Sequence, residues 1–134
     1  SKIPASTERS YMVVFKLDET LAVKAQHLIP KKQITSRIDY AFSATIFPKG
    51  NDAYVFYNDD WESDDEHDTN FKCTKLPQTG TPETLKVMHT SDDFFVNMNE
   101  VFLSTGNKIL FREDHLVDYG DVTKEVKLLE VTVP

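Results

Sequence analysis

The chain has 134 residues, a length that suits one domain with a single core and is short for two. Its content of hydrophobic residues, 40%, with 11% aromatic residues, indicates a folded protein. The net charge is −7 and no basic stripe is present to meet phosphates, so a nucleic-acid partner is not expected. No apolar run approaches the roughly 18 residues of a membrane span, so we expect a soluble protein without a membrane partner.

A single cysteine, Cys73, excludes an intramolecular disulfide and favours a reducing, cytoplasmic compartment. It lies in a short strand-like run with no histidine near it in sequence, so we expect a packing residue, not a nucleophile. Residues 1–10 are polar and are expected to form a flexible N-terminal segment. Residues 11–134 then form one domain.

Two strands are expected at the start of this domain. The apolar run over 11–17 is long enough for a strand that is buried on both faces. The next segment, 21–29, favours a strand, with a short helix as the alternative, and Pro30 is expected to end either one. A turn over 31–33 follows.

A hairpin is expected between residues 37 and 61. From Ile38 to Ile46 apolar residues alternate with small or polar ones, which is typical of a half-buried strand. The segment 48–52 contains Pro, Gly, Asn and Asp and predicts a reversal. An aromatic and β-branched run over 54–57 predicts the returning strand.

The remaining strands are expected over 71–76, 84–88, 94–103, 108–112 and 126–133. Apolar residues change face between Phe95 and Val101, which predicts a bulge, and 104–107 predicts a tight turn. With about eight short strands and no long amphipathic helix, the sequence predicts an all-β fold, an antiparallel immunoglobulin-like β-sandwich. A barrel is the alternative.

No catalytic motif is present in the sequence. The histidines are scattered and form no HExxH or Cys/His spacing, and the chain lacks GxSxG, Walker and GxGxxG motifs. The sequence therefore predicts a protein that is not an enzyme and that carries no cofactor.

An acidic run without any Lys or Arg carries the whole charge imbalance: it consists of Asp59, Asp60, Glu62, Asp64, Asp65, Glu66 and Asp68. Such a run is most often a solvated loop. The first alternative is docking onto a basic protein surface, through residues 59, 62, 64, 65, 66 and 68. Calcium binding is the next alternative, although the EF-hand spacing is missing, and a catalytic pair of acids is a further one.

The lone tryptophan, Trp61, lies inside this acidic run, which is a poor context for burial. A tryptophan in a β-sandwich is most often a core residue. An exposed indole at a strand end, with Tyr57 or Tyr54 nearby, is instead what sugar stacking needs, and neighbouring carboxylates such as Asp60 would bond the hydroxyls. We therefore treat Trp61, Tyr57 and Asp60 as candidate ligand contacts.

The stretch VFYNDDWES, residues 55–63, followed by KCTKL, residues 72–76, resembles the starch- and glycogen-binding modules of phosphatase glycogen-targeting subunits and fungal glucoamylases. Later strands at 93–101 and 108–112 extend the resemblance. The family's Trp-Asp-Asn-Asn segment is absent, and HLVDYGDVT stands in its place. The resemblance implies α-glucan binding with Trp61 as a contact, and Tyr119 as a looser one.

Two functions follow from these observations. One is a non-catalytic module that binds a polysaccharide, an α-glucan, through Trp61. The other is an immunoglobulin-like protein-interaction domain, of the adaptor or cargo-recognition type, that uses residues 59–68 or an open sheet edge. The missing Trp-Asp-Asn-Asn segment favours the second function, and the acidic surroundings of Trp61 favour the first.

Overall fold

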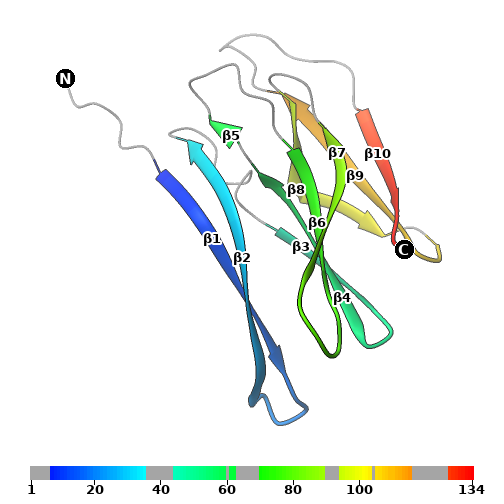
Figure 1. Ribbon diagram of the computed structural model, residues 1–134. Coiled ribbons are helices and arrows are strands. Elements are labelled where there is room, and N and C mark those ends of the chain that lie inside the picture. The colour runs from blue at the N-terminus through cyan, green and yellow to red at the C-terminus, as the bar shows by residue number, and fades with distance from the viewer. Residues whose placement is uncertain are drawn as a thin grey trace.

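A computed structural model describes residues 7–35, 44–59, 61–62, 70–89, 94–103, 105–115 and 127–134 (Figure 1). Most of these residues lie in strands, and none of them lies in a helix. A helix able to cross a membrane is accordingly not found in this part of the chain. The strands are β1 (Thr7–Leu17), β2 (Val23–Thr35), β3 (Ala44–Lys49), β4 (Asp52–Asp59), β5 (Trp61–Glu62), β6 (Asn70–Leu76), β7 (Glu83–His89), β8 (Phe94–Leu103), β9 (Lys108–His115) and β10 (Lys127–Thr132).

The described strands pair into three hydrogen-bonded sheets (Figure 1). The largest has the order β3-β4-β6-β7, and a second has the order β10-β9-β8; both are antiparallel throughout. The third consists of the antiparallel hairpin β1–β2, with the short strand β5 parallel to β2. The predicted all-β, predominantly antiparallel fold is confirmed.

The four-stranded sheet is covered on both faces. Strand β4 sends Tyr54 and Phe56 into a core that is shared with β8, β9 and β10. Its alternate residues, Val55 and Tyr57, enter a second core that is shared with β1 and β2. Because successive side chains of a strand point to opposite faces, burial of all four residues requires an apolar layer on each side of the sheet.

Three phenylalanines from different strands form the centre of the first core. The ring centroid of Phe111 lies 5.3 Å from that of Phe56 and 4.9 Å from that of Phe71, and the latter contact is edge-to-face. Phe56 and Phe71 stack at 5.9 Å. All three side chains are fully buried, so this cluster joins the β3-β4-β6-β7 sheet to the β10-β9-β8 sheet.

The hairpin β1–β2 differs from expectation in three ways. Strand β1 begins at Thr7, inside the segment expected to be flexible, and only one of its faces is buried, not both. Strand β2 continues through Pro30 to Thr35, so neither the end at Pro30 nor the turn at 31–33 is observed. Pro30 is tolerated because the pairing of β1 with β2 becomes irregular directly after it, between Arg9 and Tyr11, where a missing N–H matters least.

Other expectations are confirmed. The reversal between β3 and β4 occurs at Gly50, whose φ of 62° lies in the left-handed region that glycine adopts without strain. Strand β8 is irregular between Asn97 and Val101, where the bulge was expected. The strands expected from residue 71 onward are all present, with small differences at their ends, and 36–43 of the first hairpin lie outside the described residues.

Replacing Phe111 by alanine is expected to lower the free energy of unfolding by about 3–5 kcal/mol, since it removes a fully buried ring and leaves a cavity. Circular dichroism recorded during a urea titration measures this free energy of unfolding. Leu128→Ala is the control: its side chain is mostly exposed, so a change within about 0.5 kcal/mol is expected. Equal losses for the two variants would contradict the position of Phe111 in the core.

Candidate functional site

The structure places only part of the predicted sugar-binding and acidic residues. The backbone of Trp61 and Glu62 forms β5 and runs alongside Gln33 and Ile34 of β2. The side chains of Trp61 and Glu62 lie outside the described part of the structure, as do residues 60, 64–66, 68 and 119 in full. Sugar binding by Trp61, Asp60 or Tyr119, and partner binding by the acidic run, therefore remain predictions.

Tyr57 is a core residue. It is 1% exposed, and a 3.0 Å hydrogen bond joins its hydroxyl to the hydroxyl of Thr74 on β6. Burial is the main cause that raises the pKa of Tyr57. Tyr54 is buried on the opposite face of β4, where its hydroxyl donates to the carbonyl of Pro134 at 3.2 Å. Neither ring is presented to solvent for a sugar to stack upon.

The first acid of the acidic run, Asp59, belongs to the folded sheet. Its carboxylate is nearly buried and lies 2.7 Å from the ammonium nitrogen of Lys72 on β6. A charge that is compensated and shielded in this way is a poor docking point for a basic partner. Any such docking would depend on the acids that follow residue 59.

Asn58 has a structural role that its sequence context did not reveal. Its side-chain amide donates to the carbonyl of Val96 at 2.8 Å, and its carbonyl oxygen accepts from the Val96 N–H at 3.0 Å. Both residues are fully buried. The amide thus satisfies one backbone donor and one backbone acceptor of β8, and it ties β8 to the end of β4.

Cys73 is buried in the first core, and the expectation of a packing residue is confirmed. Removal from water raises the pKa of its thiol from 9.0 to about 12, so the thiolate that a nucleophile requires does not form near neutral pH. Across the described residues, no group of three or more His, Cys, Asp and Glu is arranged to hold a metal ion.

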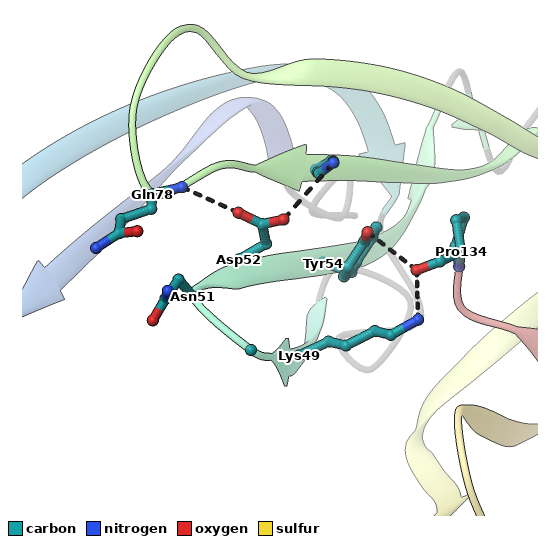
Figure 2. A pocket seen from close by; sticks show the side chains of 8 residues that line it. Lys49, Asn51, Asp52, Tyr54, Gln78 and Pro134 are labelled. Atoms are coloured by element: carbon teal, nitrogen blue, oxygen red, sulfur yellow. Dashed lines mark hydrogen bonds and ion pairs between the residues drawn. The ribbon is translucent and has the colours of Figure 1, made fainter.

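A cavity of about 680 Å³ opens at the end of the β3–β4 hairpin (Figure 2). Figure 2 shows that several of its polar groups bond one another. Lys49 donates to the carbonyl of Pro134 at 2.6 Å, and Asp52 accepts from the N–H of Gln78 at 3.1 Å and lies 3.6 Å from the ammonium of Lys75. These contacts join the turn to the loop after β6 and to the segment after β10. We assign the cavity wall a structural role.

The strongest candidate surface is the outward side of the β1–β2 hairpin. Every second residue along β1 from Tyr11 to Leu17 is exposed to solvent: Tyr11 is 60% exposed, Val13 36%, Phe15 55% and Leu17 48%. The intervening Met12 and Val14 pack inward against the second core. We call the exposed side the outer face of the hairpin; it consists of Tyr11, Val13, Phe15 and Leu17 on β1 and of Val23, Gln26, Leu28 and Pro30 on β2.

The pairing register explains why apolar residues of both strands meet on this side. Val13 pairs with Leu28, and directly paired residues share a face of the sheet. Leu17 pairs with Val23, because β2 has an extra residue at Lys24 that shifts the alternation by one position. Of the eight residues that define the outer face, seven are therefore apolar, Gln26 is polar and none is charged.

The tip of the hairpin presents a further apolar side chain. Leu21 is 76% exposed and has a φ of 65°, a conformation that usually requires glycine. Its N–H donates to the Asp18 carbonyl at 3.0 Å, which closes a turn, and the Asp18 carboxylate accepts from the N–H groups of Thr20 and Ala22. The hydrogen bond from the Thr20 hydroxyl is the main cause that lowers the pKa of Asp18.

Comparison with protein-family models, with curated proteins and with solved structures found no match to this chain. The resemblance to glucan-binding modules stays a prediction. Sequence reasoning missed the outer face because the run over 11–17 is apolar at nearly every position, which also fits a strand buried on both sides. The available signal was that Tyr11, Phe15 and Leu17 are spaced by even numbers of residues, so that all three lie on the same side of a strand.

Native Cys73 is expected to react at least about tenfold more slowly with a thiol reagent at pH 8 than the same residue in the urea-unfolded chain, because the reagent needs an accessible thiolate. Absorbance after addition of an aromatic disulfide reagent measures the rate, and Cys73→Ser provides the blank. The folded state holds this proton more tightly, so the associated stability is present below pH 9 and is lost as the pH rises toward 12. Equal labelling rates would contradict burial.

Leu21→Gly is expected to raise the free energy of unfolding by about 1 kcal/mol, because glycine adopts a positive φ without the steric cost that leucine bears. The matched control is Ala22→Gly at the next position, where φ is not positive and added chain freedom should lower stability instead. Thermal unfolding of both variants measures the difference. Loss of stability in both variants would show that Leu21 is not strained.

Proposed function

We propose that this chain is a non-catalytic protein-interaction module, with its sheets arranged in an immunoglobulin-like manner, and that the outer face of the β1–β2 hairpin binds its partner. The observation that carries the proposal is the exposure of Tyr11, Phe15 and Leu17 in one row. Contiguous exposed apolar surface of this extent is uncommon on monomeric proteins and is typical of interaction sites.

The composition of the outer face suits protein recognition. Aromatic residues are enriched among the side chains that contribute most to binding energy, and the face presents Tyr11 and Phe15. Both project from a paired strand, so little conformational entropy is lost when they are covered. Strain at Leu21 supports the same proposal, since backbone strain is often found at binding sites and this apolar residue is 76% exposed at the tip, where a partner can reach it.

The free edge of β1 is a second feature that supports the proposal. Strand β1 ends its sheet in the order β1-β2-β5, so within the described structure it pairs on one side only. Edge strands of monomers are commonly protected by Lys or Pro. The centre of β1, residues 10–15, contains neither. Such an edge extends the apolar surface with backbone donors and acceptors.

A photoreactive benzoylphenylalanine at position 15 tests the proposal. Phe102 provides the control, because it is an equally exposed phenylalanine, at 55%, on a different sheet. We expect position 15, and not position 102, to yield a protein adduct that mass spectrometry identifies. Binding of that purified protein should then weaken at least tenfold with Phe15→Ser and stay unchanged with Phe102→Ser.

Two results would overturn the proposal. The first is the same set of adducts, or none, from positions 15 and 102. The second is flotation of the chain with phosphatidylcholine vesicles that depends on Phe15 while no protein adduct forms, which would make the outer face a lipid contact.

A further inference from the structure

We infer that the partner of the outer face is a second copy of this chain, which packs its own outer face against the first in a two-fold dimer. This inference rests on the proposed function and specifies its partner. Three properties of the outer face support it: its lack of charged residues, its geometry and its exposed area.

Charge favours a second copy. Each chain carries a net charge of −7, so two copies repel one another unless they meet where charge is absent. None of the eight residues that define the outer face is charged, and Lys24, beside them, lies 3.3 Å from the carboxylate of Asp18. A basic partner would find no carboxylate on this face, whereas an identical apolar face fits it without like-charge contacts.

The position of the acidic run is compatible with this arrangement. It begins at the end of β4 and continues through β5, which pairs with Gln33 and Ile34 of β2. The hairpin tip, residues 18–22, lies at the opposite end of β2 (Figure 1). A contact over the tip-proximal half of the hairpin therefore keeps β5 of one copy away from β5 of the other.

The order of residues along β1 makes the face complementary to itself. A two-fold axis that lies in the interface, parallel to the sheet and perpendicular to β1, and passes over Val14 places Tyr11 of one copy over Leu17 of the other and Phe15 over Val13. Each aromatic ring then meets an aliphatic side chain. Two sheet faces of this kind pack about 10 Å apart with their side chains interdigitated.

The exposed area is close to what a dimer needs. An aromatic side chain can bury about 150–250 Å². The apolar residues of the outer face, each at least one third exposed, together with Leu21, leave on the order of 600 Å² uncovered per copy. Standard interfaces bury about 800 Å² per partner, so contact over this face with a modest rim is sufficient.

Sedimentation velocity of the full chain over a range of concentrations tests the dimer. We expect a monomer–dimer equilibrium in the micromolar range. Phe15→Ser should weaken it at least tenfold, because a two-fold interface loses the ring twice. Phe102→Ser, which removes an equally exposed ring elsewhere, should leave it unchanged. Far-UV circular dichroism confirms that both variants are folded.

A charge-pair experiment tests the geometry independently. Phe15→Glu and Val13→Lys should each abolish self-association. Mixed in equal amounts, the two variants should form a heterodimer, since the axis near Val14 places residue 15 of one chain against residue 13 of the other. Absence of a heterodimer would overturn this packing.

A chain that stays monomeric at all concentrations would refute the second copy. The proposed function survives that result if the photoreactive probe at position 15 still identifies a different protein, and it fails together with the dimer if no adduct forms. A wild-type dimer that Phe102→Ser disrupts and Phe15→Ser does not would also refute the inference.

Discussion

The double burial of β4 is the constraint on which the rest of the structure depends. Four consecutive side chains, Tyr54 to Tyr57, are removed from water, and a strand can achieve this only when apolar layers cover both faces of its sheet. The β10-β9-β8 sheet supplies one layer and the β1–β2 hairpin the other. The polar groups at the end of β4 follow the same logic, since Asn58 bonds the backbone of β8 and Asp59 pairs with Lys72.

This constraint explains why the hairpin is present and also why one side of it is left uncovered. The inward residues Met12, Val14 and Ile29 complete the second core and hold the hairpin on the sheet. Beyond the hairpin the described chain provides no further layer, so the outward residues of β1 remain in water. An amphipathic hairpin would carry polar residues there. The apolar residues present there are instead between 36% and 60% exposed, and the proposed contact with another molecule would cover them.

The sequence predicted the fold class and most strands because alternation, β-branched residues and turn residues are local signals. The bulge in β8 and the turn at Gly50 belong to this group. The burial of individual side chains was harder to predict from the sequence, because it depends on which sheets pack against one another. The sequence around Tyr57 is the same whether its ring faces solvent or a second core, so its burial could not be predicted. In the same way, the sequence shows Asp59 as one acid among several and does not reveal its ion pair with Lys72 on β6. The exposure of the outer face could not be predicted for the same reason, because an apolar run does not show whether both sides of its strand are covered.

The tip of the hairpin links these observations to the interaction surface. The turn is closed by Asp18, whose carboxylate bonds Thr20 and Ala22, so the backbone there is well defined. Within it Leu21 occupies a left-handed position at a steric cost of about 1–2 kcal/mol, and most of its side chain is in water. A glycine would remove the cost, and the apolar contact that leucine offers would be lost with it. Strain at this position, next to the uncharged residues of the outer face, is understandable if the proposed second chain covers both.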